Sequence, residues 1–217
     1  DKEYRPKLFK RLRGFTWIDP IHETVRTAPV VFDSDIEIIH EQEESHAKRD
    51  LEALHRAAGR EEGLSGRLFD MYARELYLAG DTEDFKNAED FFEEVCASDA
   101  CSADALKTAL CIMVKAERVL GNIQKFFKYA MKAVTAGSAS EMCLEVGDYY
   151  MEQEDYEEAS IWFYNAAYET ESIFDARSRG DKALGRMAEC CRKLGIMEKA
   201  AYYEERVKEW KENAGIE

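Results

Sequence analysis

Residues 143–171, "CLEVGDYYMEQEDYEEASIWFYNAAYETE", decide the expected fold of this 217-residue chain. The stretch reads as two helices joined by the polar turn "EDYEEA" at 154–159. Gly147 and Ala159 are small where two antiparallel helices would touch, while Tyr150 and Phe163 are large enough to fill the space beside them. The sequence therefore predicts a closely packed helical hairpin.

This hairpin resembles a tetratricopeptide repeat, whose pattern is W-x2-L-G-x2-Y, then A-x3-F, then P. Weaker copies lie on both sides, and none has the helix-ending proline. The resemblance predicts a mainly α fold, a right-handed tetratricopeptide-like α-solenoid of about four helix pairs. The pattern positions in the clearest copy are Cys143, Val146, Gly147, Tyr150, Ala159, Phe163 and Glu171. Anchors of the second helices fall at Ala88, Phe126, Ala159 and Ala200, where Phe126 and Ala130 have the two sizes in swapped order.

The front of the chain differs from this body. Pro6, Pro20 and Pro29 are the only prolines, and the long proline-free remainder suits helices. Short apolar runs at 7–13, 15–18, 22–26, 29–32 and 36–40 predict strands. We therefore expect a small β appendage at 1–40, a linker helix within 41–64 and the helical repeat domain at 65–217.

Charge and cysteine content narrow the class of protein. The net charge of −15 lies in 41–217, because 1–40 hold equal numbers of acidic and basic residues. An acidic body has no surplus of cations for nucleic acid. The six cysteines stand mostly among apolar neighbours, which predicts reduced core thiols and a cytoplasmic protein. No apolar run is long enough for a membrane span.

The front segments, "RPKLFKRLRGFTWIDPIHETV" (5–25) and "DSDIEIIHEQEESHAKRDLEALHRA" (33–57), resemble the C-terminal end of bacterial-type family-2 glycosyltransferases of the GT-A fold. Several members of that family continue directly into tetratricopeptide-like helices. Pro20 and Lys7 depart from the family's usual glycine and arginine. The chain begins at Asp1 without methionine, so we expect it to be the C-terminal fragment of a longer enzyme.

The resemblance implies a parent enzyme that transfers a sugar from a nucleotide-sugar donor and uses Mg²⁺ or Mn²⁺. The metal-binding Asp-x-Asp would precede residue 1, so the fragment itself should be inactive. His22 and Glu23 are implied to line the donor site, although a histidine packed in a strand is the alternative. Asp33 and Asp35 could hold a metal against a diphosphate. Their place in a connecting loop favours a turn instead.

First-helix positions of such repeats line a concave face. The set extrapolated here has seven basic and five acidic residues, which are either scattered solvated charges or a groove biased toward an anionic peptide or sugar phosphate. In a competing interpretation, Asp148, Glu152 and Glu189 neutralise the bases. The set is Arg67, Asp70, Arg74, Tyr77, Thr108, Cys111, Lys115, Arg118, Glu141, Asp148, Met151, Glu152, Lys182, Glu189, Arg192 and Lys193.

Two functions remain open. The helices could serve a glycosyltransferase as a module for protein interaction, for recognition of a protein, peptide or glycan acceptor, or for dimerisation. Alternatively, the chain could be a free-standing tetratricopeptide adaptor without an enzymatic parent. Phe9, Phe15, Trp17, Val30 and Val31 would lack sheet partners in an isolated front region, which predicts a homodimer or strand exchange.

Overall fold

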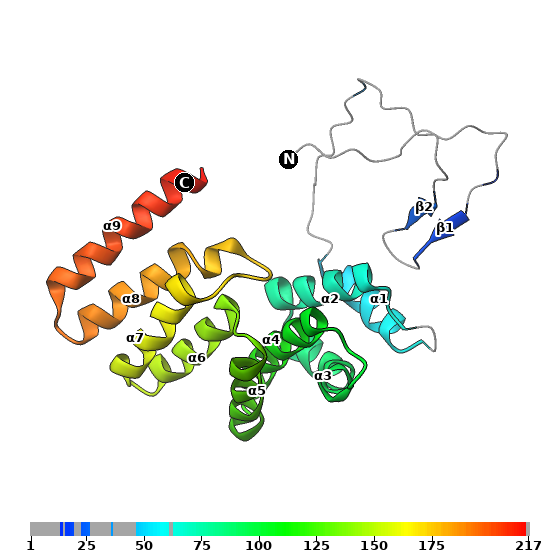
Figure 1. Cartoon of the computed structure of the whole chain (residues 1–217), viewed down its shortest axis with the longest axis horizontal. Coiled ribbons are helices and arrows are strands. Elements are labelled where there is room, and N and C mark those ends of the chain that lie inside the picture. Colours follow the sequence, from blue (N-terminus) through cyan, green and yellow to red (C-terminus); the bar gives the residue numbers. More distant parts are fainter. Residues whose placement is uncertain are drawn as a thin grey trace. The chain divides into compact units, whose positions relative to one another are not determined.

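A computed structural model describes residues 14, 16–19, 23–26, 36, 47–60 and 63–215 (Figure 1). These residues form nine α-helices and one two-stranded sheet, which confirms the mainly α fold with a small β part near the N-terminus. Contacts divide the chain into two compact units, Asp1–Tyr72 and Ala73–Glu217. The division falls inside α2 (Gly66–Ala79), eight residues after the expected start of the repeat domain at residue 65.

The first unit contains the sheet. Strands β1 (Thr16–Ile18) and β2 (Thr24–Arg26) are antiparallel, with Trp17 opposite Val25. They fall within two of the expected strands, 15–18 and 22–26. The expected strands at 7–13, 29–32 and 36–40 lie outside the described residues, apart from Ile36, which is not in a strand.

A carboxylate ties the sheet to the start of α2 within this unit. Asp19, which follows β1, accepts hydrogen bonds from Ser65 Oγ at 3.0 Å and from Arg67 Nε and Nη2 at 3.2 and 3.0 Å. Helix α1 (Ala47–Ala58) buries Leu51 and Leu54, two members of the apolar stripe typical of an amphipathic helix. The Arg67 side chain therefore pairs with Asp19 inside the first unit.

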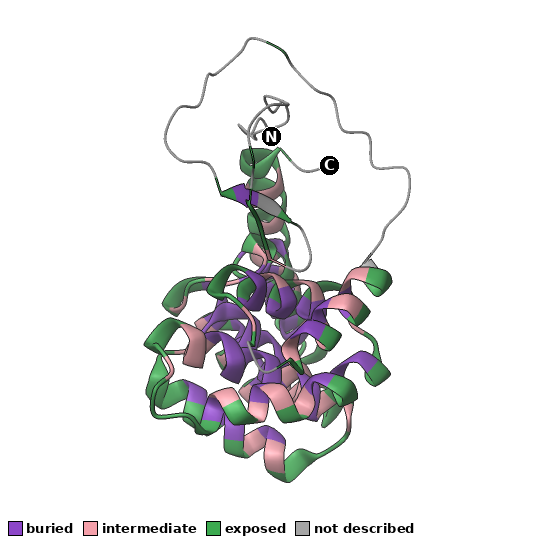
Figure 2. Cartoon of the chain, turned by 90° about the vertical axis from the view of Figure 1, so that its right-hand side faces the viewer, coloured by how far each residue is buried: buried purple, intermediate pink, exposed green. Residues whose placement is uncertain are grey.

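The second unit is a succession of helices that follows the last residues of α2. Helix α3 packs on α4, α4 on α5, α6 on α7, α7 on α8 and α8 on α9, and α4 also contacts α6. Figure 2 shows that buried residues lie on the faces these helices turn toward one another. The helices are α3 (Thr82–Ala97), α4 (Ala103–Val119), α5 (Ile123–Ala136), α6 (Ser140–Glu152), α7 (Tyr156–Tyr164), α8 (Asp181–Lys193) and α9 (Met197–Ala214), with a π-helical turn η1 (Asn165–Glu169) and a 3₁₀ turn η2 (Ala176–Ser178) between α7 and α8.

The expected second-helix anchors are core residues. Each of them is buried, and they lie on α3, α5, α7 and α9, the second helices of the expected pairs. A Cβ added to Gly147 of α6 would lie 2.5 Å from Cε1 of Phe163 on α7, so only glycine allows this approach. The predicted contact of small and large residues in the clearest hairpin is confirmed. The anchors are Ala88, Phe92, Phe126, Ala130, Ala159, Phe163 and Ala200.

Three helix pairs are joined by the same turn. After α4, Gly121 N donates to Arg118 O and Asn122 N to Glu117 O. Glu154 and Asp155 repeat these bonds after α6, and Gly195 and Ile196 repeat them after α8. The middle residue has positive φ in all three turns: 76° at Gly121, 60° at Glu154 and 75° at Gly195. Glycine adopts this conformation without strain, whereas the Cβ atom of Glu154 makes the same conformation energetically unfavourable.

The cysteines are packed as core residues. All six are free thiols, and all except Cys101 are buried. Burial raises the pKa of Cys143 to about 11 and that of Cys96 and Cys190 to about 12, because a thiolate is poorly solvated there. These three thiols are therefore protonated at neutral pH and unsuited to nucleophilic chemistry.

Two helix glycines should respond oppositely to alanine. Gly147→Ala forces a methyl group into the Phe163 ring and should lower the free energy of unfolding by about 1–3 kcal/mol. Gly185→Ala in α8, where nothing lies within 4 Å of the new Cβ, should raise it by about 0.5–1 kcal/mol through helix propensity. Urea unfolding followed by circular dichroism measures both. Equal effects would contradict the close contact of α6 and α7.

Candidate functional site

Charged side chains on α4, α6 and α8, together with the Tyr77 hydroxyl on α2, form a polar cluster in the second unit. Arg118 of α4 lies between two carboxylates of α6. Its Nε donates to Glu145 Oε2 at 2.7 Å, and its Nη1 donates to Glu152 Oε1 at 2.8 Å. We call this set the polar ladder: Tyr77, Lys115, Arg118, Glu145, Asp148, Glu152 and Arg186. Asp148 and Arg186 form a pair of their own, and Asp148 is coupled to Arg118 through charge alone.

Tyr77 and Lys115 connect α2 to α4. The Tyr77 hydroxyl donates to Glu145 Oε1 at 3.1 Å, and Lys115 Nζ donates to the Tyr77 carbonyl oxygen at 2.6 Å. The ammonium also lies 4.1 Å from the Tyr77 ring centroid, a cation–π distance. Burial raises the pKa of Tyr77 well above its ordinary value, and the negative charge of Glu145 raises it further. Burial lowers the pKa of Lys115. Tyr77 therefore stays a neutral hydrogen-bond donor.

Asp148 and Arg186 extend the ladder from α6 to α8. Arg186 Nε lies 3.0 Å from Asp148 Oδ1, a contact without the alignment of a hydrogen bond, and Nη1 donates to Glu189 Oε2 at 2.9 Å. Burial raises the pKa of Asp148, although the charge of Arg186 lowers it in part. Asp148 is consequently a carboxylate held at some electrostatic cost.

Glu141, one turn before Glu145, binds the segment after η1 to helix α6 through hydrogen bonds. Its buried Oε1 accepts backbone N–H groups of Ile173, Phe174 and Asp175 at 3.0, 2.8 and 3.0 Å. The Phe174 ring then stacks on Tyr77 with centroids 5.0 Å apart. The segment between η1 and α8 is thus bound to α6 through a carboxylate and to the ladder through an aromatic pair.

The structure brings part of the predicted groove together. Tyr77, Lys115, Arg118, Asp148 and Glu152 of the expected set share the ladder. The five other basic candidates do not join it, and one of them, Lys182, pairs with Asp175 at 2.8 Å. Arg67 binds Asp19 within the first unit, and Arg74 is exposed on α2. Arg192 pairs with Glu204 of α9 at 2.5 Å, and Lys193 Nζ lies 5.8 Å from the Tyr156 ring centroid of α7.

Sequence reasoning missed Glu145 and Arg186. The signal was present, because Glu141, Glu145, Asp148 and Glu152 follow each other at spacings of four, three and four residues, which places them on one helix face. With these two residues counted, the ladder has three bases and three acids. The ladder itself has no surplus of positive charge, and both Arg118 and Arg186 contact carboxylates. These contacts favour the alternative in which acidic groups neutralise the bases.

Most of the site residues implied by the glycosyltransferase resemblance are not among the residues that the structure describes. His22, Asp33 and Asp35 are not among the described residues, and Glu23 is exposed just before β2. Across the described ranges, no three His, Cys, Asp or Glu side chains are grouped so that they could hold a metal ion. Within the same ranges, no helix has the length and apolar character needed to cross a membrane.

Comparison with known proteins gives no assignment: no protein-family model matches the chain, and no curated protein matches it.

Two arginine substitutions should show that a buried ion pair contributes more to the free energy of unfolding than an exposed one. Arg118→Ala removes the charge partner of Glu145, whose side chain is 7% exposed, and should cost about 3 kcal/mol of unfolding free energy or more. Arg192→Ala removes an exposed pair, with side chains 49% and 47% exposed, and should cost at most about 1 kcal/mol. Urea titrations of both variants provide the measurement. Similar losses would mean that the ladder does not organise the helices.

Proposed function

We propose that the second unit is a set of tetratricopeptide-type repeats and that its polar ladder is a recognition surface for a polypeptide or glycan acceptor. The observation that carries the proposal is the position of the ladder on α2, α4, α6 and α8, the first helix of each expected pair. First helices form the binding face in this class of repeat protein. The shared turn at Gly121, Glu154 and Gly195 supports equivalent helix pairs.

The arrangement of burial suggests how the ladder would bind. Glu145 is almost fully enclosed and orients Arg118, while Glu152 is 58% exposed and can exchange its contact with Arg118 for a ligand group. An exposed ion pair contributes about 0–1 kcal/mol, so such an exchange has a low cost. A balanced set of charges suits a polar segment with donors and acceptors better than a polyanion.

We further propose that this module belongs to a family-2 glycosyltransferase, on the strength of the resemblance in 5–25 and 33–57. The catalytic part would bind the nucleotide-sugar and Mg²⁺ or Mn²⁺, and the helices would recognise the acceptor or pair two protomers. A free-standing adaptor is the competing function.

Selection from a displayed library of random peptides tests the ladder. Glu152→Gln and Arg186→Gln should each weaken binding of the selected peptides about tenfold, the effect of losing about 1.4 kcal/mol. Glu204→Gln on α9 is the matched control, because it also removes one partner of an exposed arginine pair, and it should leave affinity unchanged. Equal affinity in all three variants would exclude the ladder as the binding surface and favour a dimerisation scaffold, which sedimentation measures directly.

The genomic reading frame tests the enzymatic parent. Upstream of the codon for Asp1, the frame should encode a GT-A domain with an Asp-x-Asp motif. An initiation codon within a few codons of Asp1 would support the adaptor and exclude the glycosyltransferase.

A further inference from the structure

Helix α5 exposes a face that is both apolar and basic. Ile123, Met131 and Val134 are exposed, Met131 by 61%, and their spacings of eight and three residues place them along one side of the helix. The helix has three lysines and no acidic residue, although the whole chain has a net charge of −15. Two of these lysines, Lys128 and Lys132, are exposed. Exposed apolar groups rimmed by polar residues are typical of interaction surfaces.

Helix α7 and the π-helical turn η1 expose apolar groups together with the opposite charge. Ile161, Tyr164 and Tyr168 are exposed, Ile161 by 53%, and the rings of the two tyrosines lie 4.9 Å apart between their centroids. Residues 156–169 have three glutamates and no basic residue. Two of these glutamates, Glu157 and Glu169, are exposed, and neither forms an ion pair within the ranges that the structure describes. Their charges are therefore available to a partner.

Both helices lie next to the same end of α6. The Phe127 ring of α5 lies against Tyr149 and Tyr150 of α6, with centroids 5.1 and 6.4 Å apart. Burial raises the pKa of Tyr150, and the nearby charge of Glu158 on α7 raises it further. Figure 1 shows α6 between α5 and α7. A basic and an acidic helix, each with exposed apolar side chains, are therefore neighbours in the second unit. Both are second helices of the expected pairs, whereas the polar ladder uses first helices.

We propose that this surface, which we call the α5–α7 face, pairs two copies of the chain around a two-fold axis. In such a pair α5 of one protomer lies on α7 and η1 of the other, and symmetry makes the same contact a second time. Three lysines then meet three glutamates at both contacts, and the exposed apolar side chains are removed from water between them. The charges indicate a second copy as the occupant, because the two halves of the face complement each other. The proposal uses no side chain of the ladder and does not depend on the ladder's ligand.

Sedimentation equilibrium of the full chain, with charge reversals on either helix, tests the pairing. The unchanged chain should form a reversible dimer. The α5 variant carries Lys128→Glu and Lys132→Glu, and the α7 variant carries Glu157→Lys and Glu169→Lys. Each variant should raise the dissociation constant at least about tenfold, because like charges then meet at both contacts. Circular dichroism should show unchanged helix content, since all four side chains are exposed.

Lys208→Glu on α9 is the matched control for a reversed lysine. Lys208 Nζ lies 3.1 Å from the exposed Glu205 carboxylate, as Lys128 Nζ lies 3.7 Å from that of Glu93, but it is on neither helix of the face. This substitution changes the net charge of the chain as Lys128→Glu does. It should leave the dissociation constant unchanged.

Mixing the variants separates this arrangement from other modes of association. An equimolar mixture of the α5 and α7 variants should form a heterodimer, and a chain with all four changes should again form a homodimer, because opposite charges then meet at both contacts. The proposal is overturned if the unchanged chain is monomeric at every concentration, if both variants dimerise like the control, or if neither the mixture nor the fourfold variant restores the dimer. Peptides selected on the ladder should bind both variants unchanged, so failure of the dimer leaves the proposed function standing.

Discussion

Two buried carboxylates on one face of α6 hold the second unit together. Glu141 and Glu145 are one helical turn apart, and neither has access to enough water to be solvated. A buried carboxylate must be satisfied by donors or positive charge, so each dictates what surrounds it. Glu145 requires Arg118 and the Tyr77 hydroxyl, and Glu141 requires the amides that follow residue 172. The contacts of α2, α4 and the segment before α8 follow from these needs.

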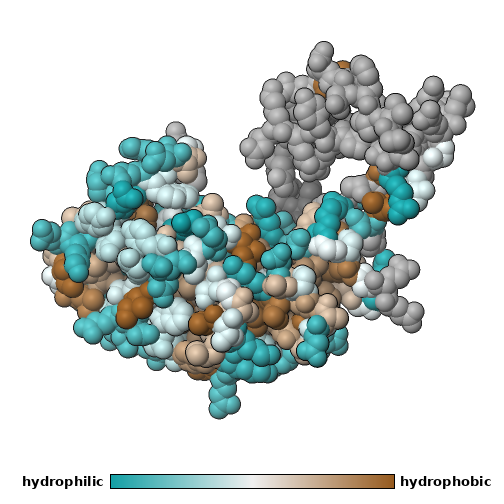
Figure 3. Space-filling model, in the orientation of Figure 1, coloured by the Kyte–Doolittle hydropathy of each residue, from teal (hydrophilic) through white to brown (hydrophobic). Residues whose placement is uncertain are grey.

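The helices make apolar contacts on one face and polar contacts on the other. On one side, close approach at Gly147 lets α7 lie against α6, and the anchors of the second helices fill the core. On the other, the first helices are joined by ion pairs of graded exposure, from enclosed Glu145 to exposed Glu152. On the face that Figure 3 shows, hydrophilic residues alternate with separate apolar patches. Apolar side chains therefore fill the core, and charged groups of the first helices keep part of their surface exposed.

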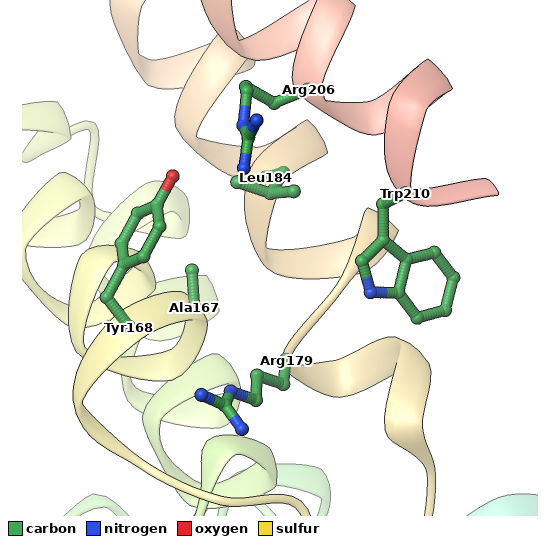
Figure 4. Close-up of a pocket in the computed structure, with 6 residues that line it drawn as sticks. All are labelled: Ala167, Tyr168, Arg179, Leu184, Arg206 and Trp210. Carbon is green, nitrogen blue, oxygen red and sulfur yellow. The ribbon is translucent and has the colours of Figure 1, made fainter. Parts of the chain in front are cut away.

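The sequence predicted the helical body and its core better than its sites. Periodicity and the sizes of Gly147, Ala159 and Phe163 were sufficient, because helix packing is local and tolerant of detail. The pairing of Arg118 with Glu145 was not predicted, although the spacing of the α6 acids places Glu145 on one helix face, because the distance between α4 and α6 cannot be read from the sequence. No pattern in the sequence indicated the pocket lined by Tyr168, Arg179, Arg206 and Trp210 (Figure 4). It depends on the π-helical turn at 165–169 and on Trp210, which lies thirty residues from Gly180 in the sequence and packs against it.

The turn at Glu154 bears on how the chain folds. The hairpin that best fits the repeat pattern is also the one whose turn forces a side chain into the left-handed region, at a cost of about 1–2 kcal/mol. The pairs joined through Gly121 and Gly195 carry no such penalty. Helix pairs whose contacts are local can fold separately, and folding then spreads from the pairs that cost least to form. The central pair is therefore expected to complete its turn late, templated by helices already in place on either side.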